Sequence, residues 1–262
     1  MDLQLTGRRA LVLASSRGLG LGVATALVAE GAHVLLTGRD ADRLAAAAAD
    51  LTARGPGRAD WTACDLGAEG AVETLVAAVA DKLGGIDILV NNSGGPAPGP
   101  VHASQPESWR KGFESMIAPI VALTHALVPQ MRAQGWGRVL TLASSGVAQP
   151  IPNLGISNSL RAALQGWSKT LATEVAADGV TANLLLPGRI HTDRVDELDA
   201  AAAARTGKTP AEVATASRAT IPAGRYGRVE EFAAVAAFLC SGPASYVTGT
   251  SVRCDGGMIR GV

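Results

Sequence analysis

Apolar runs of about five to seven residues alternate with longer segments of helical periodicity along almost the whole chain. Seven of these runs predict strands: Ala10–Ala14, His33–Thr37, Asp60–Cys64, Ile86–Asn91, Arg138–Ala143, Val180–Leu186 and Thr250–Cys254. Several of them, such as ALVLA and VTANLLL, are apolar on both faces, as parallel strands are when helices cover both sides of a sheet. The alternation predicts an α/β fold, a doubly wound parallel sheet of about seven strands with helices on both faces.

The segments between these runs have the periodicity of helices. The predicted helices are Gly18–Glu30, Asp40–Ala53, Glu69–Leu83, Pro106–Gln134, Gly155–Ala177 and Val229–Leu239. Glycines follow several of them, at Gly31, Gly84, Gly135 and Gly179, and are typical of left-handed helix caps. No linker divides the 262 residues, so we expect a single dinucleotide-binding domain over 1–262.

Residues 190–224 depart from this alternation. Within them, Thr209, Pro210 and Glu212 predict a helix start, with threonine as N-cap, proline at the first helical position and glutamate at the third. We expect this segment to form a helical lid over a substrate site, because it falls between the last two strands. The alternative is a surface insertion without that role.

Composition excludes several classes of function. The formal net charge is zero, so no broad basic field exists to bind nucleic acid. No window approaches ~18 uninterrupted apolar residues, and the N-terminus lacks a signal pattern, so we expect no membrane partner. Cys64, Cys240 and Cys254 are few and far apart, which suits reduced thiols in a cytoplasmic protein, and no pair has the spacing of zinc ligands, so no metal is expected.

A glycine-rich turn, LASSRGLGLG, joins the first predicted strand to the first helix at residues 13–22. Glycine lets the backbone approach a pyrophosphate, whose negative charge the helix N-terminus favours. A plain helix-capping turn would give the same local pattern. The candidate contacts are Ser15, Ser16, Arg17, Gly18, Leu19 and Gly20.

Other polar or glycine-containing motifs follow later strands. They are Asp65-Leu66 after the third strand, Asn91-Asn92-Ser93-Gly94 after the fourth, Ser144 after the fifth, and Pro187-Gly188-Arg189-Ile190-His191-Thr192 after the sixth. Because parallel strands end at one edge of a sheet, these motifs predict a ligand site there.

In order and spacing, these motifs together resemble those of the short-chain dehydrogenase/reductase family, over almost the whole chain. The resemblance implies a Rossmann-type fold, a nicotinamide cofactor, a small-molecule substrate, and a homodimer or homotetramer built through the long helices and the last strand. It implies that Asp65 and Leu66 flank the adenine, that Asn92, Ser93 and Gly94 line the cofactor, and that Pro187, Gly188, Ile190 and Thr192 sit at the nicotinamide. Leu13 and Ala14 replace the family's leading Thr-Gly, which predicts strain in the turn.

The second predicted strand bears on which nicotinamide cofactor is bound. It ends in Thr37-Gly38-Arg39, without the acidic side chain that accepts from the ribose 2′-hydroxyl of NAD. Arg39 follows Gly20 by 39 − 20 = 19 residues, and its guanidinium suits a 2′-phosphate, with Arg17 as a second donor. We therefore favour NADP(H), with NAD(H) left open. Solvated surface arginines are the alternative, and Asp40 is expected to be a helix N-cap.

The catalytic positions implied by the resemblance are occupied by other residue types. The family places serine, tyrosine and lysine where this chain has Ser144, Ser157 and Arg161, and asparagine where it has Met116. An aliphatic hydroxyl is a far weaker acid than a phenol, and a guanidinium does not shuttle protons. The chain therefore resembles a divergent subgroup of 3-oxoacyl-[acyl-carrier-protein] reductases that lacks the Tyr-x-x-x-Lys pair.

The sequence contains four other candidates for the acid, two tyrosines and two histidines. Of the two tyrosines, Tyr246 is expected at a packing position and Tyr226 beside the lid. His191 has a suitable pKa range and falls at the expected site mouth, and His102 is a weaker candidate. Three functions stay open: an oxidoreductase, an NADP(H)-binding sensor without turnover, and a structural or interaction subunit.

Overall fold

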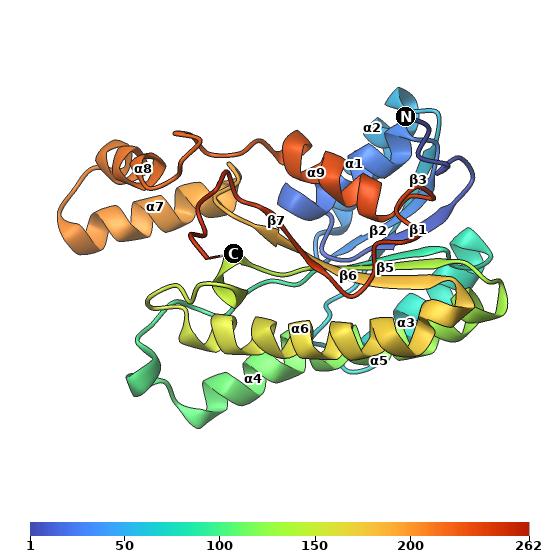
Figure 1. Cartoon of the computed structure of the whole chain (residues 1–262), viewed down its shortest axis with the longest axis horizontal. Coiled ribbons are helices and arrows are strands. Elements are labelled where there is room, and N and C mark those ends of the chain that lie inside the picture. The colour runs from blue at the N-terminus through green and yellow to red at the C-terminus, as the bar shows by residue number, and fades with distance from the viewer. Residues whose placement is uncertain (262) are drawn as a thin grey trace.

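The computed structural model describes residues 1–261 and contains a seven-stranded sheet in which every neighbouring pair is parallel (Figure 1). The strand order is β3-β2-β1-β4-β5-β6-β7. The strands are β1 (Arg9–Val12), β2 (His33–Gly38), β3 (Arg58–Ala63), β4 (Ile88–Asn91), β5 (Gly137–Leu142), β6 (Val180–Pro187) and β7 (Ser251–Cys254). This is the doubly wound Rossmann-type sheet expected from the apolar runs.

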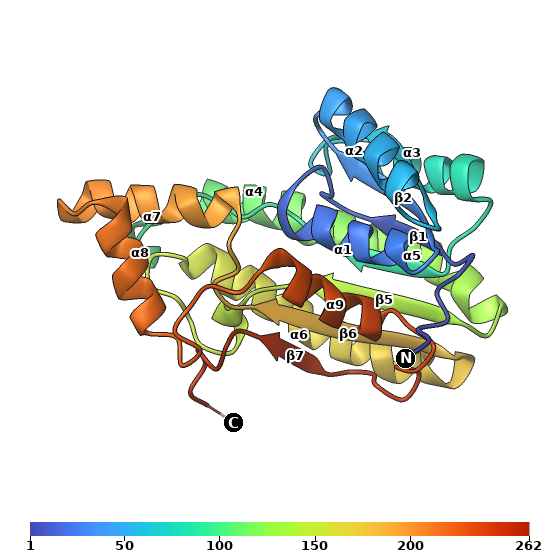
Figure 2. The same cartoon turned by 90° about the horizontal axis from the view of Figure 1, so that it is seen from above.

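Helices cover both faces of the sheet (Figures 1 and 2). One face carries α1 (Gly18–Ala29), α2 (Ala41–Arg54) and α9 (Val229–Leu239), and the other carries α3 (Ala71–Ala78), α5 (Ala118–Ala133) and α6 (Gly155–Val175). The residues of β4 and β5 are all buried, which explains why these strands have no polar face. Burial of Val, Leu, Ile and Ala from both layers against the sheet supplies the main stabilisation.

The predicted helix Pro106–Gln134 is wrong as one element. The structure divides it into α4 (Pro106–Met116) and α5, with a turn at Ile117. The cause is Pro119, because proline has no N–H to donate to the carbonyl of Ser115 and disfavours helical backbone at the preceding residue. By length and hydropathy this stretch could span a membrane, but half of its most apolar 18-residue window is buried, as in a core helix.

Boundaries elsewhere differ by a few residues. Strand β1 ends at Val12, two residues before the expected end, because Ala14 adopts a left-handed conformation with φ of 47°. The expected strand Asp60–Cys64 runs over Arg58–Ala63, and the helix expected over Glu69–Leu83 becomes α3 followed by a π-helical turn at Val79–Leu83. The four predicted helix-end glycines all have positive φ.

Between β6 and α9 the chain forms α7 (Asp193–Thr206) and α8 (Pro210–Ala219), which project beyond one end of the sheet (Figure 2). The helix start predicted at Thr209 is confirmed. The Thr209 hydroxyl accepts from the backbone N–H of Glu212, and the Glu212 carboxylate accepts from that of Thr209, which completes a capping box.

Candidate functional site

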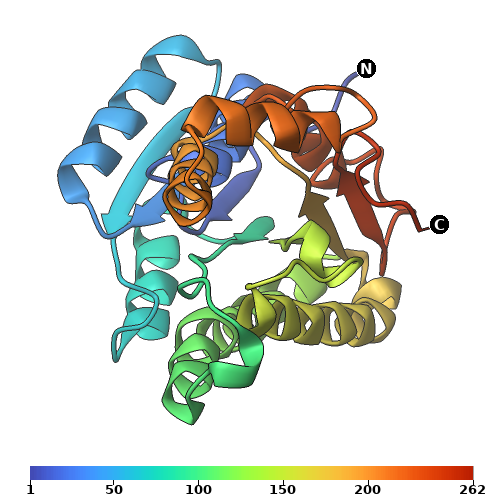
Figure 3. The ribbon, with the colours of Figure 1, turned by 90° about the vertical axis from the view of Figure 1, so that its left-hand side faces the viewer.

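The carboxyl ends of the seven parallel strands lie at one edge of the sheet, where α7 and α8 project toward the viewer in Figure 3. The strand order reverses between β1 and β4, since β1 pairs with β2 on one side and β4 on the other. In open α/β sheets, ligands bind at such a switch point. The motifs identified in the sequence all follow strands that end here.

The glycine turn after β1 is a strained backbone cradle. Ala14 has φ of 47°, so the strain expected where alanine replaces glycine is present. A Cβ on Gly20 would overlap the carbonyl oxygen of Ala14, so only glycine fits at that position. Asn92 Nδ2, from the end of β4, donates to the same carbonyl at 3.3 Å and ties the turn to the switch point.

The two serines of the turn, Ser15 and Ser16, differ in their surroundings. Ser15 is fully buried; its hydroxyl donates to the carbonyl of Val12 at 2.7 Å and accepts from the backbone N–H of Thr37 at 2.9 Å. It therefore holds β1, the turn and β2 together. The Ser16 side chain lies beside Gly38 at the end of β2, and the partly buried Leu19 packs against the core under α1.

The two arginines proposed for a 2′-phosphate have different surroundings. Arg17 Nη1 lies 3.4 Å from Asp193 Oδ2 and 3.7 Å from Glu197 Oε1, which links the glycine turn to α7. Arg39 follows β2, is exposed, and forms no ion pair within residues 1–261. Asp40 caps α2 by accepting from the backbone N–H of Arg43 at 3.0 Å, as expected.

The motifs after β3 and β4 border the same edge. Asp65 is exposed and accepts from the backbone N–H of Gly67, while Leu66 packs partly against the core. Ser93 is buried, yet its hydroxyl has no hydrogen-bond partner among the described residues. A buried hydroxyl normally has a partner, so this oxygen and the Gly20 cradle together fit a polar ligand such as a dinucleotide.

The motif after β6 is shaped by close backbone packing. A Cβ on Gly188 would lie 2.6 Å from the Cα of Asp255, so the residue that follows β7 leaves no room for a side chain there. Ile190 is buried, and Thr192 is the N-cap residue of α7. His191 is largely exposed and its Nε2 lies 3.2 Å from Asp196 Oδ1, so its ring is turned toward α7.

The three candidate catalytic residues come from the end of β5 and the start of α6. Ser144 accepts from the backbone N–H of Gly146 at 3.0 Å, which begins a single 3₁₀ turn. Ser157 and Arg161 lie four residues apart on α6 and therefore share one face of the helix. Arg161 Nη1 donates to the carbonyl of Leu142 at 3.2 Å, two residues before Ser144.

Arg161 carries a buried charge that only two long hydrogen bonds to carbonyl groups stabilise within residues 1–261. Its Nη2 donates to the carbonyl of Ser93 at 3.4 Å, and it forms no ion pair within residues 1–261. Burial lowers the pKa of Arg161 to about 10, which leaves the guanidinium charged at neutral pH. The site therefore holds a fixed positive charge between the ends of β4 and β5.

Met116, at the family's asparagine position, and Tyr246, a candidate acid, have opposite surroundings. Met116 packs with Ile120, Leu160 and Leu164 in an apolar cluster between α4, α5 and α6. Tyr246 is fully exposed, so its expected packing role is wrong in this chain taken alone. The reason is that Tyr246 lies in a turn before β7, outside the helices and strands.

Two structural links escaped the sequence analysis. Asp199 on α7 is buried and accepts from Arg189 at 3.0 Å and from the Tyr226 hydroxyl at 2.7 Å, which fastens α7 to the β6 motif and to the segment before α9. Burial, followed by this hydrogen bond, raises the pKa of Tyr226. Asn158 Nδ2 donates to the carbonyl of Ile151 and fixes the loop before α6. No local sequence pattern predicts either set of contacts.

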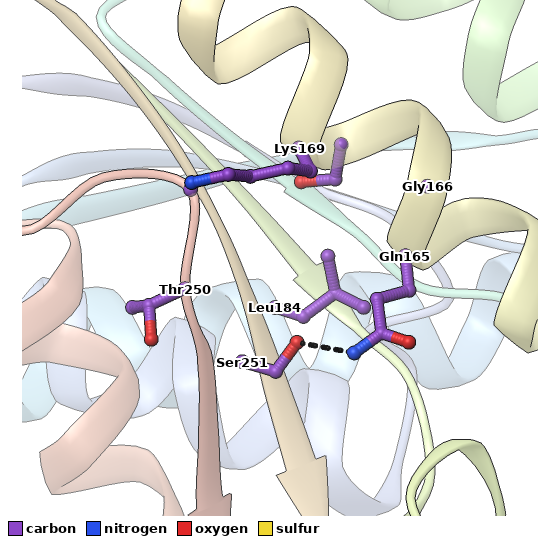
Figure 4. A pocket seen from close by; sticks show the side chains of 8 residues that line it. Gln165, Gly166, Lys169, Leu184, Thr250 and Ser251 are labelled. Atoms are coloured by element: carbon purple, nitrogen blue, oxygen red, sulfur yellow. Dashed lines mark hydrogen bonds between the residues drawn. The ribbon is translucent and has the colours of Figure 1, made fainter.

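A cavity of about 500 Å³ lies between α6 and β7 and is lined by none of the candidate site residues. Figure 4 shows Gln165 donating to Ser251 across it, with Lys169 above. A smaller cavity of about 180 Å³ borders Arg189 and Ile190 of the β6 motif. In the part of the chain described, no three His, Cys, Asp or Glu side chains are grouped to hold a metal ion.

Comparison with known proteins is consistent with this architecture. Residues 13–259 match a family model described as Enoyl-(Acyl carrier protein) reductase. The chain is 35% identical over 256 residues to dehydrogenase/reductase SDR family member 4 of Sus scrofa, covering 97% of this chain and 88% of that one. It is 33% identical over 258 residues to 3-oxoacyl-[acyl-carrier-protein] reductase FabG of Vibrio cholerae, covering 98% and 99%.

A solved structure matches over both full lengths. L-sorbose reductase from Gluconobacter frateurii, in complex with NADPH and L-sorbose, has a TM-score of 0.94 and 34% sequence identity, with 100% of each chain covered. The similarity therefore includes the seven strands, the glycine turn and the α7–α8 segment together.

Proposed function

The chain belongs to the short-chain dehydrogenase/reductase family, and from that premise we propose that it is an NADP-dependent oxidoreductase with a non-standard active site, acting on a small carbonyl or alcohol substrate. The observation that carries the proposal is the cradle at the switch point, where Gly20, Ala14 and Asn92 meet. It is a backbone surface suited to a pyrophosphate. The NADPH complex of the sorbose reductase supports the same cofactor for this chain.

Preference for NADPH over NADH rests on the end of β2. Arg39 is exposed and unpaired within the described chain, so it is free to meet a 2′-phosphate, and no acidic side chain occupies the place of a ribose 2′-hydroxyl acceptor. Arg17 is a second donor when it leaves Asp193 and Glu197 of α7. The remaining proposed contacts are Ser15, Ser16, Gly18, Leu19, Asp65, Leu66, Ser93, Gly94, Pro187, Gly188, Ile190 and Thr192.

Bound NADPH supplies a hydride to the substrate. The residues proposed to act on the substrate are Ser144, which orients its carbonyl, and Ser157, whose hydroxyl helps to order water. Arg161 holds a fixed positive charge beside the ribose and the reacting carbonyl. The α7–α8 segment within 190–224 is proposed as a lid over this site, held at Asp199.

The assembly is proposed to be a cytoplasmic homodimer or homotetramer. Phe113 on α4 is half exposed, and half of the most apolar window of the α4–α5 stretch is left unburied by the single chain. Light scattering of the purified protein tests this directly, because a monomer at micromolar concentration would contradict it.

Calorimetric titration of the purified protein with NADPH, and in parallel with NADH, tests the proposed function. We expect micromolar NADPH binding and much weaker NADH binding, followed by NADPH oxidation in a carbonyl-substrate screen. Binding without oxidation of any substrate would favour a sensor that has lost turnover. If neither cofactor bound, the oxidoreductase assignment would give way to a structural or interaction role.

A further inference from the structure

The first turns of α7 lie against Arg17 of the glycine turn. Arg17 Nη1 lies 3.4 Å from Asp193 Oδ2 and 3.7 Å from Glu197 Oε1, so two carboxylates share one guanidinium nitrogen. Asp193 and Glu197 are four residues apart on α7 and therefore project from the same face of the helix. The contact joins two segments that are 176 residues apart in the sequence.

The start of α7 is connected to both ends of the proposed cofactor site. Thr192, the N-cap residue of α7, is a proposed contact at the nicotinamide, and Asp193 follows it directly. Arg17, the N-cap residue of α1, is a proposed contact of the 2′-phosphate at the adenosine end. A change in what Arg17 binds should therefore be felt at the start of α7.

The two carboxylates and a 2′-phosphate would compete for the same side chain. A guanidinium binds carboxylates and phosphates through the same N–H donors. A phosphate monoester carries a charge of about −1.5 to −2 at neutral pH, so carboxylates that stayed beside Arg17 would also repel it. Helix α1 has no acidic residue in its first turn, so the negative charge beside Arg17 comes from α7.

Both carboxylates have other support when Arg17 leaves them. Glu197 Oε2 lies 3.2 Å from Arg194 Nη1 on the same helix. Asp193 is the first residue of α7, where the helix N-terminus favours a negative charge. The side chains of Arg17, Asp193 and Glu197 are about half exposed or more, and an exposed ion pair is weak. A bound phosphate can therefore displace these carboxylates at little cost.

Building on the proposed function, we propose that Asp193 and Glu197 are determinants of cofactor choice, which bind Arg17 until the 2′-phosphate of NADP(H) displaces them. The phosphate releases the start of α7 from the glycine turn, whereas NAD(H), which lacks that phosphate, leaves the two joined. Helix α7 keeps its attachment at Asp199 in both cases. The carboxylates thus lower the affinity for NADP(H) and couple its binding to α7.

Calorimetry with 2′,5′-ADP tests the competition, because this probe carries the 2′-phosphate without the nicotinamide. The counterpart without the 2′-phosphate is 5′-AMP. Asp193→Asn combined with Glu197→Gln should tighten the binding of 2′,5′-ADP and of NADPH about three- to tenfold, the scale of two exposed ion pairs. The affinity for 5′-AMP should not change. In an Arg17→Gln background the same two substitutions should leave every affinity unchanged, because the carboxylates act through Arg17.

Asp196→Asn is the matched control. Asp196 lies between Asp193 and Glu197 on α7, but its Oδ1 lies 3.2 Å from His191 Nε2. The substitution removes an equal charge from the same part of the helix without removing a partner of Arg17, so the affinity for 2′,5′-ADP should stay nearly unchanged. An equal gain in Asp196→Asn would overturn the proposal, because general repulsion of the phosphate by α7 would then explain the effect.

Hydrogen exchange at residues 193–199, measured by mass spectrometry, tests the release of α7. In the wild type, exchange should be faster with saturating 2′,5′-ADP than with saturating 5′-AMP, and in the double variant it should be equal with the two probes. Equal exchange in the wild type, or an unchanged affinity of the double variant for 2′,5′-ADP, would overturn the proposal even if NADPH bound tightly. Failure of the wild type to bind NADPH at all would instead remove the proposed function on which this inference rests.

Discussion

The Tyr226 hydroxyl donates to Asp199 across 2.7 Å and so joins the segment before α9 to α7. Asp199 also accepts from Arg189, which makes one buried carboxylate the meeting point of the β6 motif, α7 and the segment before α9. Backbone hydrogen bonds of Gly227 with Arg189 and His191 also join the β6 motif to the segment before α9, so changes at Asp199 should act on α7 rather than on the sheet.

Tyr226→Phe removes one hydrogen bond to a buried carboxylate and should lower the free energy of unfolding by about 1.5–3 kcal/mol. If α7 is a lid, the KM for substrate should rise while the Kd for NADPH changes little. Urea unfolding and steady-state kinetics measure both. Tyr246→Phe, at a fully exposed phenol, is the control and should alter neither. If both substitutions changed the free energy of unfolding and the KM equally, the Tyr226–Asp199 hydrogen bond would not be what holds α7 in place.

Gly20→Ala should abolish dinucleotide binding, because the added methyl group would overlap the Ala14 carbonyl oxygen and force the turn open. Calorimetry with NADPH measures the loss. Gly166→Ala is the control, since Gly166 lies in α6 with nothing within 4 Å of an added Cβ. Alanine there should be neutral, or stabilising by up to about 1 kcal/mol. Unchanged NADPH binding in Gly20→Ala would place the pyrophosphate elsewhere.

Arg39→Ala should weaken NADPH binding about tenfold or more and leave NADH binding unchanged, because it removes a charge-assisted contact that only the 2′-phosphate can make. Arg54→Ala, at the far end of α2 and paired with Asp50, serves as the control. An equal loss of affinity for NADPH and for NADH would mean that Arg39 supports the fold of the site and does not select NADPH.

The double substitution Ser157→Tyr with Arg161→Lys restores the acid and cation types of the family. It should create or raise reductase activity toward a simple ketone, and a general acid typically contributes 10²–10⁴-fold to the rate. Ser159→Tyr with Arg161→Lys is the control, because it places the phenol at an exposed position of the same helix. This variant should not gain reductase activity toward the ketone. A fall in an existing activity, with no gain on ketones, would show that the native pair supports another mechanism.

Asp87 gives the stability of the fold a dependence on pH. The carboxylate accepts two bonds from the Arg9 guanidinium, at 2.9 and 3.0 Å. Burial alone would raise the pKa of Asp87, but the Arg9 side-chain and backbone hydrogen bonds and charge outweigh it and hold the pKa below its ordinary value. The stabilisation is thus complete above the unfolded pKa of about 3.9 and is lost as pH falls through the lower folded value.

Asp87→Asn should therefore cost about 1.5–3 kcal/mol at pH 7. Its unfolding free energy should also fall less steeply than that of the wild type below pH 4. Urea unfolding as a function of pH measures the difference. If the unfolding free energies of the two proteins fell in parallel below pH 4, other carboxyl groups would be responsible for the loss of stability in acid.

The sheet and most helices could be predicted because the apolar pattern alone distinguishes buried parallel strands from amphipathic helices. The break at Ile117 was present in the sequence as Pro119, but the apolar periodicity on either side masked it. The capping box at Thr209 was predictable because it is local.

Links between distant residues could not be read in this way. The partners of Asp199 come from segments 10 and 27 residues away, and only the fold brings them together. The burial of Arg161 likewise depends on where β4 and β5 end. The sequence identified Arg161 as a site residue, but it could not show that the charge is buried without a counter-charge among the described residues. The expected role of Tyr246 failed because no local pattern distinguishes an exposed turn from a packed one.

The position of β1 in the sheet also has a consequence for how the protein is made. Ala10 pairs with Val34 on one side and with Ile88 on the other, a separation of 88 − 10 = 78 residues. On the ribosome, β1 can join β2 early, but its second edge stays unpaired until β4 has emerged. An apolar strand edge of this kind is open to pairing with other chains. During synthesis there is thus an interval in which the edge of β1 that later pairs with β4, inside the finished sheet, is exposed to aggregation.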